Sequence, residues 1–163
     1  MFSIGDTVCY PLHGVGRIES IEDRQVLEKK ATYYVIALNN TRMTAMLPIA
    51  TAEEVGLRHI ISPSECDKVI DYIKTAEVGI GDSNWNQRYR DNMEKLRRGD
   101  PFNVIDVILC LTKRNRMRTL SSGERKMLSN AKSILVSEIS AVTGRSIEDC
   151  EKWVFEGLPE ARI

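Results

Sequence analysis

The first fifty residues alternate apolar and polar positions in short runs, which is the pattern of half-buried β-strands. These runs are rich in β-branched and aromatic residues and are separated by Pro, Gly and Asn, which end strands and form turns. The alternation of the second run slips once near Ile18, which indicates a β-bulge. We expect strands over residues 7–10, 14–27, 33–38 and 43–47. Four or five short antiparallel strands in so short a segment predict a small barrel of the SH3 or Tudor kind.

From residue 51 onward the apolar positions recur with the helical period, and N-capping signals appear repeatedly. Ser62 is followed by Pro63 and then by Glu65, and Ser121 is followed by Glu124 at the spacing of a capping box. Five helices are expected: over 62–76, from 83 or 84 to about 97, from 100 through 111, from 121 to about 142, and from 146 through Trp153.

The fold class that follows is α+β, with a small antiparallel barrel followed by an all-α helical bundle. Residues 77–83 contain two glycines and show no periodicity, which predicts a linker. We therefore divide the chain into a barrel domain over 1–60, a connecting helix and linker over 61–81, and a helical domain over 82–163.

The composition is that of an ordinary soluble protein, with 42% hydrophobic and 28% charged residues. The four cysteines form no C-x-x-C pair and the chain has two histidines, so we expect no metal site and no cofactor. The longest dense apolar stretch, 104–111, is too short to cross a bilayer, and the start of the chain lacks the apolar segment of a secretory signal. We therefore expect a cytoplasmic protein whose reduced thiols serve as small core side chains.

The formal net charge of zero conceals an uneven distribution along the chain. Residues 82–129 hold 11 of the 23 Lys and Arg residues, against 6 acidic residues in the same segment. This excess of positive charge indicates a surface that faces a polyanion, although a solvated helix face gives the same count.

The helix predicted near residues 84–97 carries a narrow apolar stripe. Trp85, Tyr89, Met93 and Leu96 fall within about 80° of one another at 100° per residue. Periodicity alone favours a core position for Trp85. Its place in the first turn, next to a polar linker and among arginines, also fits an indole that projects as an apolar wedge while cations hold phosphates. The sequence pattern leaves both interpretations open.

Four segments of the chain carry distinctive motifs. They are 2–16 (FSIGDTVCYPLHGVG), the strand end at Pro48 with 55–58 (VGLR), 84–90 (NWNQRYR) and 120–128 (LSSGERKML). Together and in this order they resemble the CarD/CdnL family of bacterial transcription regulators, over essentially the whole chain and without large gaps.

The resemblance implies a two-domain transcription factor that is not an enzyme. Its Tudor-like domain, which the family shares with the transcription-repair coupling factor, would bind the β subunit of RNA polymerase. Its helical domain would contact promoter DNA at the upstream edge of the melted bubble. The residue that matches Trp85 would wedge into the minor groove there and slow the collapse of the open complex.

The motif positions also imply individual site residues. The expected DNA-binding residues are Trp85 as the wedge and, on the sugar–phosphate backbone, Arg88, Arg90, Arg125 and Lys126. On the polymerase side, Arg24 matches a family arginine, and Met46 stands where relatives have a second one. We expect Arg42, placed on the same strand face as Met46, to substitute for that second arginine.

Physical chemistry is consistent with these expectations. A few arginines give weak and salt-sensitive DNA binding, so a tether to polymerase would be needed to raise the effective concentration. A wedge binds a duplex that polymerase has already distorted better than an intact one, and it thereby favours the open form. The minor groove offers a degenerate code, so sequence specificity should be low. We expect a protein that is monomeric when free and associated with the nucleoid through polymerase.

An enzyme is one alternative class. Ser129 and Lys132 match the S-x-x-K pattern of acyl-serine enzymes, but the companion motifs are absent and the tetrad falls within a helical repeat. Cys9 and His13 form a candidate nucleophile pair at a strand end, where turn and packing roles are common. These patterns favour a protein without catalytic activity.

Two binding classes are further alternatives. A Tudor-like module that reads peptides would need an aromatic cage from Tyr10, Tyr33 and Tyr34, but alternation sends the last two to opposite faces. A helix-turn-helix repressor without polymerase binding is permitted by Gly123 between two helices. No dimerisation seam or basic recognition helix supports that second alternative.

Overall fold

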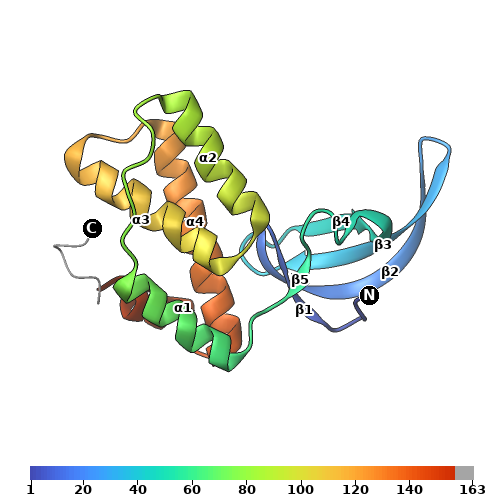
Figure 1. Ribbon diagram of the computed structural model, residues 1–163. Helices are drawn as coiled ribbons and strands as arrows, with labels where there is room; N and C mark the ends of the chain where they lie inside the picture. Colours follow the sequence, from blue (N-terminus) through green and yellow to red (C-terminus); the bar gives the residue numbers. More distant parts are fainter. Residues whose placement is uncertain (157–163) are drawn as a thin grey trace.

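The first third of the chain forms an antiparallel sheet in the computed structural model, which describes residues 1–156 (Figure 1). The strands lie in the order β4-β3-β2-β1-β5. Their bounds are β1 Thr7–Tyr10, β2 Gly14–Val26, β3 Lys29–Leu38, β4 Thr44–Pro48 and β5 Arg58–His59, with a 3-10 turn, η1, at Ile49–Thr51. The expected closed barrel is wrong, because β4 pairs only with β3, β5 pairs only with β1, and the two edges do not meet. The sheet is therefore open.

The β-bulge predicted near Ile18 is confirmed. Ile18 pairs with Ile36 and Ser20 pairs with Val35, so Glu19 is the extra residue. The bulge keeps Ile18 buried while the strand continues beyond the body of the sheet.

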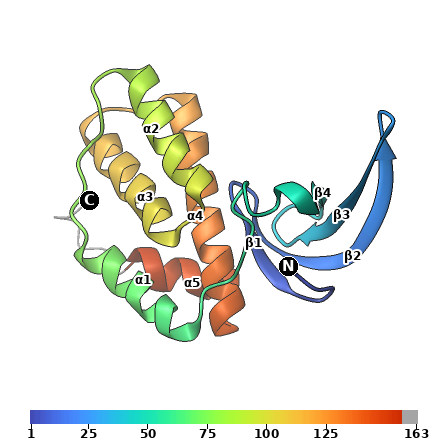
Figure 2. The same cartoon turned by 45° about the vertical axis from the view of Figure 1, so that its right-hand side comes forward.

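The outer halves of β2 and β3 form a hairpin that projects away from the rest of the molecule (Figure 2). Val26 pairs with Lys29, so the loop consists of Leu27 and Glu28. Both loop residues have positive φ, 47° and 65°, as a tight hairpin turn with matching twist requires.

Five helices follow the sheet. Their bounds are α1 Pro63–Thr75, α2 Trp85–Arg98, α3 Pro101–Met117, α4 Ser122–Thr143 and α5 Ile147–Glu151, with a π-helical turn, η2, at Lys152–Glu156 that contains Trp153. The predicted helix starts are confirmed, because each has the expected N-cap side chain bonded to the first turn. Gly99 and Gly144 end α2 and α4 with φ of 69° and 73°, the left-handed conformation that favours glycine.

The helical core is centred on α3, which contributes side chains such as Ile105, Ile108 and Leu111 that are inaccessible to solvent. Helix α1 adds Val69 and Ile73 to the same core. The segment expected to connect the domains therefore supplies one helix of the bundle. All four cysteines are buried, as the sequence predicted.

The two domains are joined by an ion pair between β5 and α4. The Arg58 guanidinium donates to both carboxylate oxygens of Glu138, at 2.6 and 2.9 Å, and also to the Gly99 carbonyl. The same carboxylate accepts the backbone N–H of Ile61 at 3.0 Å. Burial alone would lower the pKa of Arg58, but the Glu138 carboxylate holds it above its usual value. Four donors and acceptors from both domains are thus satisfied at one point.

We predict that Glu138→Ala lowers the free energy of unfolding by about 2–3 kcal/mol, because it leaves the Arg58 guanidinium and the Ile61 N–H without their partner. Chemical denaturation of the full chain measures this loss. The control is Glu94→Ala, which removes an exposed carboxylate of α2 and should change stability by less than about 0.5 kcal/mol. Equal losses in the two variants would show that this ion pair does not hold the domains together.

Candidate nucleic-acid interface

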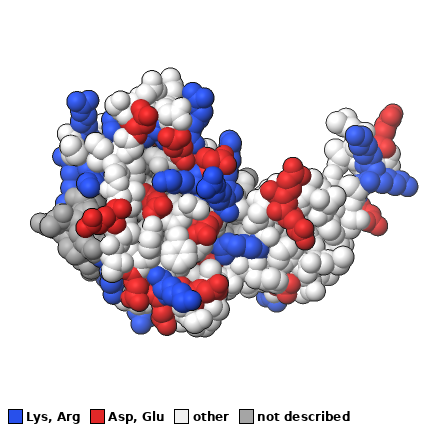
Figure 3. Space-filling view, viewed as in Figure 1, with Lys and Arg blue, Asp and Glu red and all other residues white. Residues whose placement is uncertain are grey.

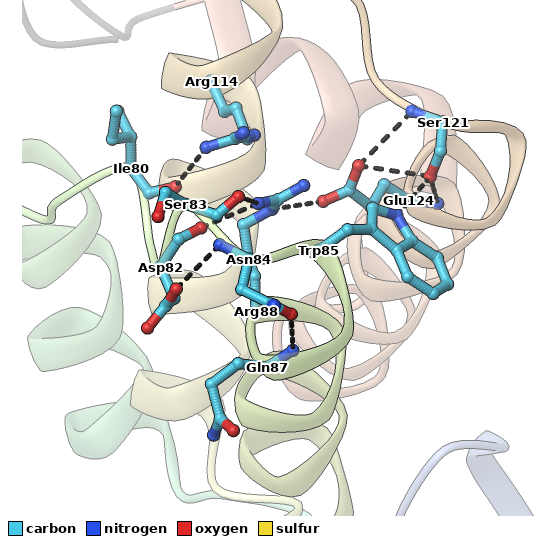
Figure 4. Close-up of polar contacts among 10 residues, drawn as sticks. All are labelled: Ile80, Asp82, Ser83, Asn84, Trp85, Gln87, Arg88, Arg114, Ser121 and Glu124. Carbon is cyan, nitrogen blue, oxygen red and sulfur yellow. Dashed lines mark hydrogen bonds and ion pairs between the residues drawn. The ribbon is translucent and has the colours of Figure 1, made fainter.

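Trp85 lies at the surface at the first turn of α2, with 43% of its area exposed. Its indole stacks on Tyr89, with ring centroids 5.1 Å apart and an interplanar angle of 24°. The indole N–H donates to the Ser121 hydroxyl of α4's N-cap at 2.9 Å (Figure 4). The indole is therefore neither a core side chain nor a freely projecting one, since one ring face and one edge are held and the remainder is open to solvent.

The hydroxyl that holds the indole is itself fixed by a capping box. Ser121 Oγ accepts the Glu124 backbone N–H at 3.2 Å and donates to the Glu124 carboxylate at 3.1 Å. Gly123 lies below the ring pair: a Cβ there would be 3.6 Å from Tyr89 and 3.7 Å from Trp85, which is ordinary contact. The ring pair therefore packs on the first turn of α4.

Arg88 is buried, although the family resemblance implied a contact with the DNA backbone. Only 4% of its area is exposed. Its guanidinium donates to the Glu124 carboxylate at 2.5 Å and to the carbonyls of Asp82 and Ser83 at 2.7 and 3.4 Å (Figure 4). In this position it holds the linker, α2 and α4 together, and we remove it from the set of expected phosphate contacts.

The Glu124 carboxylate is charged at the centre of this arrangement. Burial by itself would raise the pKa of Glu124, but the hydrogen bonds from Arg88 and Ser121 and the Arg88 charge hold that pKa below its usual value.

The other expected DNA-contacting residues lie on the surface, and two of the three lie near the ring pair. Arg90 and Lys126 are exposed and have no hydrogen-bond or ion-pair partner within residues 1–156. Arg125 is exposed, and one of its guanidinium nitrogens donates to the Leu120 carbonyl at 3.1 Å. Trp85, Arg125 and Lys126 come together because α2 begins beside the N-terminus of α4, whereas Arg90 lies about 140° around α2 from Trp85.

Part of the positive charge counted over 82–129 is structural. Lys113 and Arg114 donate to the carbonyls of Val78 and Ile80 in the linker, at 3.2 and 3.4 Å. These contacts hold the linker on α3 and reduce the number of cations available for phosphates. On the face drawn in Figure 3, the Lys and Arg side chains over the helical domain are interspersed with Asp and Glu.

The sequence did not predict the stacking and hydrogen-bonding partners of Trp85. Tyr89 was placed on the apolar stripe, and its spacing of four residues was the available signal for a stacked pair. Ser121 was identified as a helix cap without a link to the indole, because the two residues are 36 positions apart.

The expected polymerase-contacting residues lie on the sheet domain. Arg24 is exposed on β2 and is paired with Glu22 at 2.7 Å. Met46 is 43% exposed on β4. The pairing of Ser20 with Val35 and of Val35 with Met46 places Arg24 and Met46 on the same outward face.

The expected position of Arg42 on that strand face is wrong. Arg42 lies in the turn before β4 and has a positive φ of 52°. The Leu38 N–H donates to the Met43 carbonyl and closes this turn, and β4 begins at Thr44, after Arg42.

The residues considered for a catalytic site or an aromatic cage do not come together in either kind of site within residues 1–156. Burial raises the pKa of the Cys9 thiol to about 12, which leaves it protonated. Lys132 lies over the Phe155 ring at 5.2 Å, and Tyr34 is buried in the sheet core while Tyr33 faces the other side. Within residues 1–156 there is no group of three potential metal ligands, and no helix is long and apolar enough to cross a bilayer.

We predict that Glu124→Gln destabilises the chain by about 2 kcal/mol at neutral pH, because the buried Arg88 charge loses its partner. The folded-state pKa of Glu124 is lower than that of the unfolded chain, so its stabilising contribution is complete above the unfolded value of about 4.3. It is lost as the pH falls through the folded value. The difference in unfolding free energy between wild type and variant should therefore shrink below about pH 4.3.

Denaturation at neutral and acidic pH measures this difference. Glu65→Gln is the matched control, since Glu65 occupies the same capping-box position in α1 but is exposed and has no ion pair within residues 1–156. If the wild-type advantage over Glu124→Gln were the same at both pH values, Glu124 would not be the ionised partner of Arg88.

Comparisons with known proteins find a family match for each of the two domains. Residues 2–61 match the family described as the CarD-like/TRCF RID domain, and residues 68–155 match the CarD C-terminal domain. The protein named "Putative transcription factor YdeB" of Bacillus subtilis (strain 168) is 32% identical over 156 residues, covering 88% of this chain and 94% of its own length. The two domain matches and this relative point to a transcription regulator and not to an enzyme. The chain belongs to the CarD family of transcription regulators.

Proposed function

We propose that the protein binds the β subunit of RNA polymerase through its sheet domain and stabilises the promoter open complex through its helical domain. The observation that carries the proposal is the exposed Trp85 indole, which is held at the surface by Tyr89 and Ser121. At the upstream edge of the bubble this indole inserts into the minor groove, where the base steps are already partly unstacked. The protein thus acts in the cytoplasm, at the nucleoid, wherever polymerase is bound.

The fixed orientation of Trp85 supports a wedge. An indole that is already held in one position loses little conformational freedom on binding, so more of its contact energy favours the complex. The exposed cations Arg125 and Lys126 are available for phosphates beside it, and Arg90 for a phosphate farther around α2. None of these contacts reads a base edge, which agrees with low sequence specificity.

The outward face of β2 and β4 supports polymerase binding. Arg24 and Met46 lie on this face, and both are exposed. A guanidinium and an apolar thioether on one face suit a partner surface that offers a carboxylate and, at a separate point, an apolar patch. Arg42, in the neighbouring turn, contributes a second exposed cation at one end of the face.

The junction between the domains makes the sheet domain an effective tether. The Arg58–Glu138 pair fixes the sheet relative to α4, and α4 carries the N-cap that holds Trp85. Once the sheet binds polymerase, the indole is confined near one position on the DNA, which raises its effective concentration.

The helix-turn-helix alternative is disfavoured by burial. The second helix of such a pair would be α4, but its side chains Ala131, Leu135 and Ile139 are buried in the bundle. A recognition helix must present an exposed face to the major groove along its first turns. Here Gly123, in the first turn of α4, is covered by the rings of Trp85 and Tyr89.

The lifetime of the open complex after addition of a competitor tests the proposal. Wild type should lengthen this lifetime, and Trp85→Ala should lose the effect at every protein concentration. A wedge that contributes about 1.4 kcal/mol corresponds to about a tenfold change in lifetime. Arg24→Glu should need a higher concentration but should reach the wild-type lifetime at saturation, because it weakens the tether and leaves the wedge intact.

Trp153→Phe is the matched control, since Trp153 contacts Arg145 just beyond the C-terminus of α4, whereas Trp85 lies at the N-terminus of that helix. It should behave as wild type. If Trp85→Ala lengthened the open-complex lifetime as much as wild type does, the wedge would be excluded. Wild-type behaviour of Arg24→Glu at low concentration would remove Arg24 from the polymerase interface.

A further inference from the structure

A groove of about 730 Å³ lies between α2 and α4 and starts beside the Trp85–Tyr89 pair. Tyr89 and Met93 of α2 and Met127 of α4 provide its apolar lining, together with Leu12 from the β1–β2 turn. Its volume falls in the range of sites that bind small organic molecules or single nucleotides.

The charge around the groove favours a negatively charged occupant. Lys126 is the only charged residue in the lining among the described residues, and no acidic side chain lines it. Arg90 and Arg97 lie on the exposed face of α2 about 40–60° beyond Met93 at 100° per residue. Within residues 1–156 none of these three cations has a hydrogen-bond or ion-pair partner.

The α4 wall offers hydrogen-bonding groups. The Asn130 amide nitrogen donates to the Leu12 carbonyl at 3.4 Å, so its carbonyl oxygen stays available as an acceptor. The Ser129 hydroxyl has no hydrogen-bond partner within the described residues and can donate or accept. An apolar lining, a mixed donor and acceptor wall and a cationic rim match the base, the base edge and the phosphate of a nucleotide.

We propose that this groove binds one unstacked nucleotide of single-stranded DNA. The base lies on Tyr89 and the two methionines, its edge contacts Asn130 and Ser129, and its phosphate contacts Lys126. This inference rests on the proposed function and deepens it, because it assigns a second element to the interface besides the Trp85 wedge. A duplex keeps its bases stacked and paired, so the groove selects melted DNA.

Fluorescence anisotropy of the full chain with a labelled hexathymidylate, compared with a labelled blunt duplex, tests this proposal without polymerase. The single strand should bind more tightly than the duplex at low salt. Ser129→Trp should weaken single-strand binding about fivefold or more, because the exposed α4 position allows the indole to fill the groove without entering the core. Lys126→Gln should weaken it about twofold and reduce its salt dependence by about one phosphate contact.

Two variants of the same helix serve as matched controls. Ala141→Trp adds the same ring at an exposed position toward the other end of α4, and Lys132→Gln removes a cation that lies over Phe155 and outside the groove. Both should bind the single strand as wild type does. Unchanged single-strand affinity of Ser129→Trp, or duplex binding as tight as single-strand binding, would overturn the proposal.

This assay separates the groove from the wedge. Loss of single-strand binding in Ser129→Trp supports the groove even if wild type does not lengthen the open-complex lifetime, in which case the proposed function fails alone. If the wild-type chain lengthens that lifetime but does not bind the single strand, the groove proposal fails alone.

Discussion

The buried ion pair between Arg88 and Glu124 is the interaction on which the DNA-facing end of the protein depends. Arg88 satisfies two linker carbonyls and the carboxylate at once, so the linker, α2 and α4 have one relative position. Glu124 in turn belongs to the capping box whose serine holds Trp85. Burying two charges is costly unless the remaining donors and acceptors are also satisfied, and here the carbonyls and the N-cap do so. The position of the exposed Trp85 side chain is thus set by the buried Arg88–Glu124 ion pair.

Helix α4 fixes the positions of both the sheet domain and the helix that carries Trp85. Its buried Glu124 anchors α2, and its buried Glu138 anchors β5 of the sheet domain. A protein that links a polymerase to DNA needs this arrangement, because a flexible junction would spread the effective concentration of the wedge over a large volume. The groove lies between α2 and α4, so a nucleotide bound there would contact elements whose positions are already fixed.

The sequence was informative where local chemistry decides the structure. N-caps at Ser62 and Ser121 and the bulge near Ile18 depend on residues close in the chain, and all were predicted. Barrel closure failed as a prediction because it depends on whether the two edge strands meet, which no local pattern encodes. Arg88 was misplaced for a similar reason: its partner lies 36 residues away, and a buried arginine in a basic helix resembles its exposed neighbours. Trp85 is between these cases, since its helix position was predicted and its hydrogen bond was not.

The central claim is that the N-cap of α4 holds Trp85 in a solvent-exposed position. Acrylamide quenching and anisotropy of Trp85 fluorescence, in a chain where Trp153→Phe leaves one tryptophan, test it most directly. The indole should be open to quencher yet restrained in motion, and Ser121→Gly, which removes the hydroxyl but keeps a residue tolerated at N-caps, should increase its motion. Ser62→Gly, the same change at the α1 cap, should not. An indole shielded from acrylamide, or one whose motion Ser121→Gly leaves unchanged, would contradict the claim.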